Sequence, residues 1–392
     1  NEGRSRSPRD IIGSYGQKVL AAVAHVLGGE TADGAPVPVA KDKADGELVA
    51  SSAAKVRESL AQIGQEPAKN NIHRSASIVG KSLVAELRQR GQEFALLSEG
   101  DDRAEAEILQ REPVALLSYE AMDEKVLEDK ICQSLNIQGD LMVSVDVNLP
   151  YRADSYDLIA KVEALQERWQ NPNIFYRLPA TAEGVVALEA LTVRGVKTEV
   201  RAIYDYFTYH AVLNGYINGL KRFVQNHSGD PATVQSIASF CVNRVDSAVD
   251  KIIRDIPGLA GNCGLVGIYL ASALYQYRHK RQLQEDWQEL ARVGGQSQRL
   301  MWIGTAVENP NYSPTRYVDH LIGDRTISAM NQATYQLFQQ SGNSSGQLEA
   351  NLAQALKLLE TISTKGCDLT AIGRQLEAEY AQERDRLLAA RK

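Results

Sequence analysis

The sequence has 392 residues, of which 44% are hydrophobic and 23% are charged. These values are typical of folded proteins and exclude collagen-like, coiled-coil and wholly disordered chains. The 43 Lys and Arg residues against 49 Asp and Glu residues give a net charge of −6, which predicts no nucleic-acid partner. No apolar run approaches the roughly 20 residues of a membrane-spanning helix, so we expect a protein that does not span a membrane.

Four cysteines, Cys132, Cys241, Cys263 and Cys367, lie far apart and form no CxxC pair. This spacing argues against a zinc motif and against a disulfide framework, and it is typical of a reducing compartment. We therefore expect no metal site and a soluble protein of the cytoplasm or the plastid stroma.

Residues 1–91 predict an N-terminal extension that is mostly helical or irregular. An amphipathic stretch at 11–26 is followed by a tract rich in Gly, Ala, Pro, Asp and Lys at 28–46, which has no periodicity and is typical of a linker. A weak helical pattern covers 48–90. No convincing strand pattern is found in this part, and we expect that it cannot form a core alone.

Residues 92–392 predict a barrel domain, because short apolar runs alternate with amphipathic helical patterns in the manner of βαβ units. Seven strands, with an eighth near 264–269 or beyond it, favour a (β/α)₈ barrel over an open doubly wound sheet. No GxGxxG turn follows any strand, so we expect no dinucleotide and no other cofactor. The predicted strands are 93–98, 113–119, 140–147, 173–178, 196–204, 236–242 and 299–304.

Helices are predicted at 155–169, 182–194, 206–225 and 247–253 between these strands. Two further helical patterns occupy 346–392. The second of them begins after Asp368, a residue type favoured at the N-cap, and ends in basic residues, as a helix C-terminus prefers.

Three long segments carry a resemblance to a known family. They are LPATAEGVVALEAL (178–191), SIASFCVNRVDSAVDK (236–251) and QRLMWIGTAVENPNYSPTRYVDHLIGDRTISAMNQAT (298–334). In this order they resemble the transaldolases, specifically the long bacterial and plastid type. The likeness extends from about residue 140 to the C-terminus. It implies a (β/α)₈ barrel that cleaves ketose phosphates through a lysine Schiff base, with ancestry in the pentose phosphate pathway.

The positions that the resemblance implies for catalysis hold different residues here. The Schiff-base lysine, two residues before the Pro-Ala-Thr segment, is Arg177, and a guanidinium does not form a productive imine because it stays protonated. The acid–base glutamate of the third strand corresponds to Asp146. The threonine of the fifth strand that positions a water corresponds to Arg201. An ion pair between Asp146 and Arg177 is an alternative use of these two side chains.

The phosphate site implied by the resemblance is also altered. Ser239 and Arg244 match the family's serine and arginine on and after the sixth strand. Gly304 and Glu308 stand at the positions of a serine and a lysine, and an acidic residue repels a phosphate. Arg177, Arg201 and Arg244 are expected to converge at the barrel mouth, where they could bind a small anionic ligand.

The first two strands offer weaker correspondences. The second strand provides Ser118 and Tyr119 where the family has an asparagine, and the first provides Glu99, Asp101 or Asp102 for an aspartate.

These departures lead to the hypothesis of a catalytically degenerate transaldolase-like pseudoenzyme with no catalytic residue. It would serve as a structural scaffold or regulatory subunit of a larger assembly, and residues 1–91 would dock it onto other protein subunits. Two alternatives remain. One is an active transaldolase-type enzyme that uses another lysine or a reaction without an imine. The other is a sensor of an anionic sugar phosphate.

Overall fold

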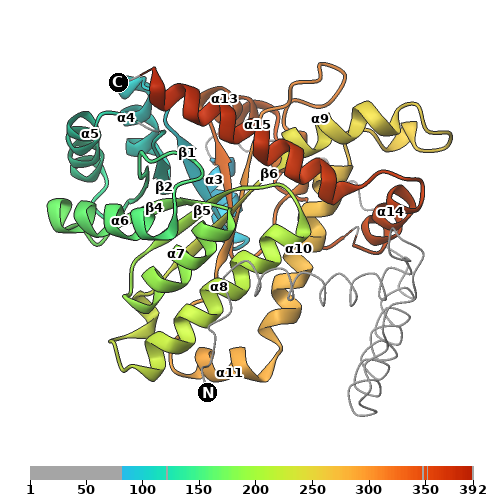
Figure 1. Cartoon of the computed structure of the whole chain (residues 1–392). Coiled ribbons are helices and arrows are strands. Elements are labelled where there is room, and N and C mark those ends of the chain that lie inside the picture. The colour runs from blue at the N-terminus through green and yellow to red at the C-terminus, as the bar shows by residue number, and fades with distance from the viewer. Residues whose placement is uncertain (1–81, 121, 347, 351, 391–392) are drawn as a thin grey trace, which may run out of the picture. The chain divides into compact units, whose positions relative to one another are not determined.

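The computed structural model of the protein describes residues 82–120, 122–346, 348–350 and 352–390. Within this part, eight parallel strands pair in chain order and close into a barrel, because β8 pairs with β1 (Figure 1). The prediction of a (β/α)₈ barrel is confirmed. The strands are β1 (Gln92–Leu97), β2 (Val114–Ser118), β3 (Met142–Asp146), β4 (Ile174–Pro179), β5 (Thr198–Ile203), β6 (Ser236–Cys241), β7 (Arg299–Ile303) and β8 (Thr326–Met330).

Helices alternate with the strands and surround the barrel (Figure 1). Most begin at a side chain that accepts a backbone N–H, such as Asp154, Thr181, Asp205 and Asp368. The helices are α3 (Leu83–Gln89), α4 (Asp102–Arg111), α5 (Glu124–Ile137), α6 (Ser155–Trp169), α7 (Ala182–Val193), α8 (Tyr206–Gln225), α9 (Val242–Ile253), α10 (Val266–Gln282), α11 (Glu285–Arg292), α12 (Arg316–His320), α13 (Gln332–Ser341), α14 (Leu352–Thr364) and α15 (Leu369–Ala389), with short 3₁₀ turns at Pro231–Thr233 and Ala260–Asn262.

The eighth strand lies beyond the segment first considered for it. The apolar segment at 264–269 leads into α10, which buries residues all round, whereas β8 occupies Thr326–Met330. A short apolar run cannot distinguish a buried strand from a buried helix by periodicity alone, and this is the source of the ambiguity.

The predicted extension of residues 1–91 lies mostly outside the described residues. Its amphipathic stretch, its linker and its docking role therefore stay predictions. The described part includes α3, which packs against β1 and α13. No helix in the described part of the chain is long and apolar enough to cross a membrane.

A small apolar layer fills the interior of the barrel. Its members come from alternate positions of the strands and are separate from the larger core between strands and helices: Ala95, Leu116, Phe175, Ile237, Met301, Ile327 and Ala329. Because strand side chains alternate between faces, residues two positions further along point into the same interior. On β2, β4 and β6 those residues are Ser118, Arg177 and Ser239. The barrel is therefore apolar in its middle and polar toward the carboxyl ends of its strands.

Gly184 allows α7 to begin directly against β4. The hydroxyl of Thr181 accepts its N–H at 3.0 Å, and a Cβ atom at this position would overlap the carbonyl oxygen of Pro179. We expect Gly184→Ala to lower the free energy of unfolding by about 1–3 kcal/mol, because a backbone carbonyl cannot move aside as a side chain would. Urea unfolding measures the change. Gly261→Ala is the matched control, since no atom lies within 4 Å of its added Cβ. Equal changes in the two variants would contradict this explanation.

Candidate functional site

The candidate residues gather at the carboxyl ends of the barrel strands, which form one mouth in parallel barrels and carry the active site in enzymes of this fold. Strand register places Asp146 of β3 beside Arg177 of β4, and Pro179 of β4 beside Arg201 of β5. Asp146, Arg177 and Arg201 are all buried. Buried charges must be paired, so the contacts of these side chains define the site.

Glu199 of β5 lies at the centre of the site and is fully buried. Its carboxylate accepts hydrogen bonds from Nε of Arg177 at 3.3 Å, Nε of Arg201 at 3.0 Å and the hydroxyl of Ser239 at 2.8 Å, and also from the hydroxyl of Ser144. Burial alone would raise the pKa of Glu199. The charges of Arg201 and Arg177 and the two hydroxyl donors outweigh burial and lower this pKa to about 2. Glu199 is therefore ionised at neutral pH.

Arg177 and Arg201 converge on one hydroxyl. The Nη2 atoms of Arg177 and Arg201 donate to Oγ of Ser118 at 2.6 and 2.9 Å. Glu120, just after β2, accepts from Nη1 of Arg201 at 2.5 Å. The two guanidinium groups are thus held between Glu199 in the barrel and Glu120 at its rim, and these carboxylates compensate their mutual repulsion.

One donor of Arg177 is left over. Its Nη1 atom is buried and makes no hydrogen bond with the described residues. The nearest acidic oxygens are Oε2 of Glu120 at 3.6 Å and Oδ2 of Asp146 at 3.9 Å, beyond hydrogen-bonding distance. A buried donor without a hydrogen bond is costly and calls for an explanation, such as a water molecule, a ligand or a role in catalysis.

The backbone bends where Arg201 enters the site. Ala202 has a φ of +71°, and the register between β5 and β6 shifts between Val200 and Ile203. An alanine in the left-handed region costs free energy, and such strain is concentrated at functional sites. The bend lies directly after Arg201, the residue whose guanidinium group lies beside that of Arg177.

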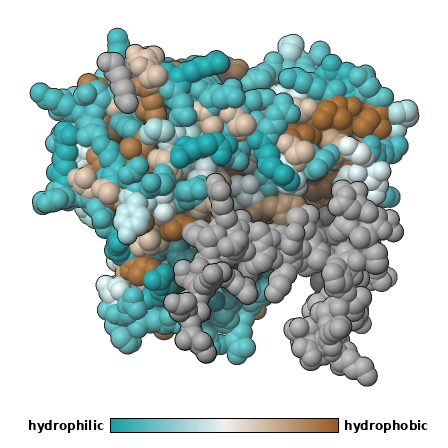
Figure 2. All heavy atoms as spheres, in the orientation of Figure 1, coloured by the Kyte–Doolittle hydropathy of each residue, from teal (hydrophilic) through white to brown (hydrophobic). Residues whose placement is uncertain are grey.

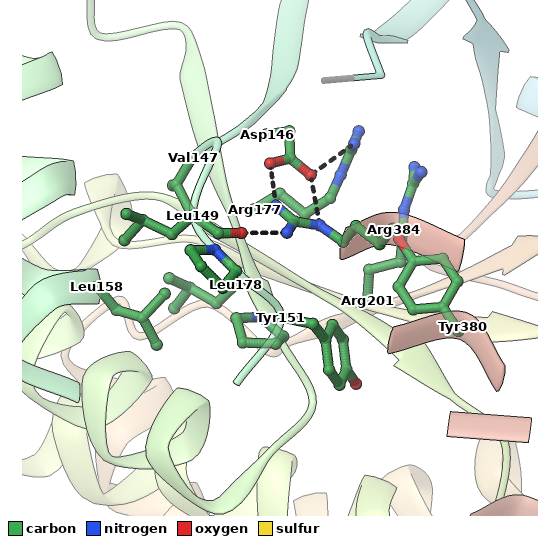
Figure 3. Close-up of a pocket in the computed structure, with 12 residues that line it drawn as sticks. Asp146, Val147, Leu149, Tyr151, Leu158, Arg177, Leu178, Arg201, Tyr380 and Arg384 are labelled. Carbon is green, nitrogen blue, oxygen red and sulfur yellow. Dashed lines mark hydrogen bonds and ion pairs between the residues drawn. The ribbon is translucent and has the colours of Figure 1, made fainter. Parts of the chain in front are cut away.

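Asp146 is bound by Arg384 of α15, 238 residues later in the chain (Figure 3). Nε of Arg384 donates to Oδ2 of Asp146 at 3.3 Å, and its two Nη atoms donate to Oδ1 of Asp146 and to the carbonyl of Leu149. The backbone N–H of Asn148 donates to Asp146 at 2.7 Å. Tyr380 of the same helix lines the remaining cavity, whose volume of about 10 Å³ is about that required by one water molecule.

Arg244 stands apart from the other two arginines. Its Nη2 donates to Oε2 of Glu383 on α15 at 2.5 Å. Glu308 accepts from Nδ2 of Asn243 at 3.2 Å, and Gly304 has a φ of +66° with no room for a Cβ beside Asn243. The expected convergence thus holds for Arg177 and Arg201, whereas Arg244 is paired with α15.

The weaker correspondences on the first two strands separate in the structure. Ser118 is in the site, but the hydroxyl of Tyr119 bonds to α5, outside the barrel. Glu99 accepts from a residue before α13, Asp101 caps α4, and Asp102 pairs with a lysine of α5. None of these three acidic residues lines the cavity described above.

No lysine lines this cavity in the described part of the chain. Lys197 precedes β5, at the opposite end of the barrel, and its Nζ donates to the carbonyl of Pro172 at 2.8 Å. It is therefore no substitute for a lysine at the mouth. The described residues also contain no group of three or more His, Cys, Asp or Glu side chains that could hold a metal ion.

Sequence reasoning missed several members of the site, namely Glu199, Glu120, Ser144, Tyr380, Glu383 and Arg384. Glu199 carried a signal, because it lies two residues before Arg201 on a buried strand and therefore on the same face. Glu120 follows Ser118 by two positions. Tyr380 and Arg384 carried no signal, since only the tertiary fold brings α15 over the mouth.

Comparisons with known proteins match most of this barrel. The sequence model of the family described as Transaldolase/Fructose-6-phosphate aldolase matches residues 98–385. A transaldolase of Saccharopolyspora erythraea is 31% identical over 243 residues, or 60% of this chain and 65% of the relative. A transaldolase of Mycolicibacterium paratuberculosis is 30% identical over 247 residues, or 62% and 65%. The chain thus spans just under two thirds of the length of these relatives.

The hypothesis that the chain is a pseudoenzyme is wrong, because the family match and the curated relatives named transaldolase point to an enzyme. That hypothesis equated the absence of a lysine at position 177 with the absence of chemistry. A carbonyl can also be activated electrostatically by fixed donors in a site that excludes water.

Proposed function

Because the chain belongs to the transaldolase/fructose-6-phosphate aldolase family, we propose that it is an enzyme that breaks and forms a carbon–carbon bond of a ketose phosphate without an imine. In this proposal Arg177 donates hydrogen bonds to the substrate carbonyl and so makes it more electrophilic. Asp146 is the base. The substrate class is part of the proposal, since the chain spans only 65% of the length of the first relatives.

The Nη1 of Arg177, which makes no hydrogen bond with the described residues, is the observation that carries this proposal. It is a buried cationic donor within 3.6 and 3.9 Å of the carboxylates of Glu120 and Asp146. A donor and a base on neighbouring strands are what proton abstraction with enolate stabilisation requires. Glu199 and Ser118 hold the guanidinium in place, so little reorganisation is needed during the reaction.

In the direction of cleavage, Asp146 removes the proton of the hydroxyl next to the bond that breaks. The bond's electrons move to the substrate carbonyl, and an aldehyde leaves. The resulting enolate oxygen accepts hydrogen bonds from Arg177. The enolate carbon then either takes a proton back from Asp146, which completes an aldolase reaction, or attacks an acceptor aldehyde. In the second case the new alkoxide takes the proton from Asp146, and the carboxylate is regenerated.

Arg244 is the proposed ligand of the phosphate group. It is about one-third exposed and needs only to part from Glu383 to bind an anion. Arginine suits this role because its planar group binds phosphate oxygens in pairs. Glu308 accepts a hydrogen bond from Asn243, and Arg244 is paired with Glu383.

The test combines turnover with trapping on the full chain. We expect fructose 6-phosphate to be cleaved, or its three-carbon unit to be transferred to an added aldehyde, while borohydride treatment in its presence leaves the mass of the protein unchanged. A covalent adduct on any lysine would overturn the imine-free mechanism. Binding and thermal stabilisation by fructose 6-phosphate without turnover would instead favour a sensor of a sugar phosphate.

A further inference from the structure

Two consecutive residues of α15 form ion pairs with two side chains of the proposed site. Glu383 binds Arg244, the proposed phosphate ligand, and Arg384 binds Asp146, the proposed base. Each therefore presents the charge opposite to that of the group it covers. The carboxylate of Glu383 lies where the phosphate group of a substrate would bind Arg244. The guanidinium of Arg384 neutralises Asp146, the proposed base.

The same helix is tied to the loop between β3 and α6. The backbone N–H of Tyr151 donates to Asp385 at 2.9 Å, and Arg152 pairs with Glu377 at 3.4 Å. In Figure 1, α15 (red) crosses the barrel from the α14 side toward α4, and it contacts α9 and β5. The contacts of α15 thus connect both sides of the mouth.

The two halves of α15 are held in different ways. Its first half buries Ile372, Gly373 and Leu376, and the last buried residue of the helix is Ala381. Beyond Ala381 the side chain of Leu387 is about half exposed. Tyr380 packs edge-on against the ring of Tyr151, so it belongs with the packed part of the helix. The second half beyond Ala381 is therefore held mainly by ionic contacts rather than by apolar packing.

The pair of Glu383 with Arg244 is partly exposed and contributes little free energy. The pair of Arg384 with Asp146 is largely buried, so this half can leave the barrel only where water or a ligand takes over the contacts of Asp146.

From these contacts we infer that residues 382–389 of α15 are an internal occupant of the substrate site, which a sugar phosphate displaces in order to bind. This inference rests on the proposed function, because it assigns Arg244 and Asp146 to substrate. The cavity of about 10 Å³ beneath Tyr380 and Arg384 has room for a water molecule but not for a sugar phosphate. Substrate and the second half of α15 therefore exclude one another.

Displacement has a quantitative consequence for binding. When only a fraction of the chains is open, the apparent dissociation constant of a ligand is its intrinsic constant divided by that fraction. Weakening the closed state must therefore tighten the binding of every ligand that uses the open site. The effect concerns affinity and does not require a new contact with the ligand.

Glu383→Gln and Arg384→Gln in the full chain test this inference. We expect the dissociation constants of inorganic phosphate and fructose 6-phosphate, measured by calorimetry, to fall by about tenfold in each variant, which is about 1.4 kcal/mol of closed-state stabilisation removed. Glu379→Gln and Arg386→Gln are the matched controls, because they change the same charges on exposed positions of the same helix. The controls should leave both constants unchanged.

Hydrogen exchange of the wild-type chain gives a second measurement that needs no variant. Fructose 6-phosphate should accelerate exchange of the amides of residues 382–389 and leave those of residues 372–380 unchanged. Slower exchange at 382–389 would overturn the inference, since α15 would then close over the ligand instead of making way for it.

The outcomes separate this inference from the proposed function. If the wild type turns over substrate but neither Glu383→Gln nor Arg384→Gln binds ligands more tightly, the displacement by substrate is contradicted and the proposed enzymatic function is kept. Tighter phosphate binding in both variants without turnover in any of them supports the displacement and contradicts the proposed enzymatic function. If no variant binds either ligand, both the displacement and the enzymatic function are contradicted.

Discussion

Glu199→Gln is expected to lower the free energy of unfolding by about 3–5 kcal/mol, the range found when one partner of a buried ionic network is lost. The substitution keeps the shape of the side chain but leaves Arg177 and Arg201 without the charge that both of them contact inside the barrel. Thermal unfolding should shift downward by roughly 10 °C, and urea unfolding gives the free energy directly. Glu107→Gln is the control, because its ion pair with Arg103 is exposed and contributes about 0.5 kcal/mol or less.

The effect of this substitution should depend on pH in a defined direction. The pKa of Glu199 in the folded chain is about 2, against an ordinary value of 4.5. A lowered pKa means that the stabilisation, about 3 kcal/mol for such a shift, is fully present above pH 4.5 and is lost as the pH falls toward 2. The difference in stability between the wild type and Glu199→Gln should therefore shrink over this interval. A difference that stays constant from pH 7 to pH 3 would show that Glu199 acts through packing and not through its charge.

Arg177→Lys should not produce an imine-forming enzyme, although it places a lysine where the family resemblance implies one. The new ammonium would lie among the carboxylates of Glu199, Glu120 and Asp146, which favour its protonated form, and a protonated amine is not a nucleophile. We expect no borohydride-trapped adduct with fructose 6-phosphate at pH 7. We also expect a loss of turnover of about 10²-fold or more, because a fixed donor to the enolate is removed.

The double variant Arg177→Lys with Glu199→Gln tests the reason given for this result. Removing the closest carboxylate should lower the pKa of the lysine, and each unit of that change gives about tenfold more free amine. More adduct in the double variant than in Arg177→Lys, measured by mass spectrometry, is the expected result. Equal labelling of both would mean that access to the site, and not protonation, limits the reaction.

The barrel was predictable from sequence because its signals are local. The run around β4 and the helix that begins after Thr181 are each specified within about ten residues, by burial pattern, capping and the clash that excludes a side chain at Gly184. The position of Arg177 at the end of β4 was likewise readable.

The interactions within the site were not predictable in the same way. The pairing of Asp146 with Arg384 depends on the path of α15 across the mouth, which no local pattern specifies. The place of Glu199 on the same face of β5 as Arg201 was readable, but its bonds to Ser144 of β3 and Ser239 of β6 were not. They depend on the register between neighbouring strands, which no local pattern specifies.

The three serines that surround the two arginines have a consequence for directed evolution of this site. Ser118, Ser144 and Ser239 are small enough to leave space for two guanidinium groups, and each also makes a hydrogen bond to this cluster. A substitution of any one residue of this cluster leaves a buried charge unpaired or removes a hydroxyl group that hydrogen-bonds to it. Libraries that vary one position at a time are therefore expected to give mostly destabilised proteins. New specificities are to be sought in libraries that vary the serines together with Arg177 and Glu199.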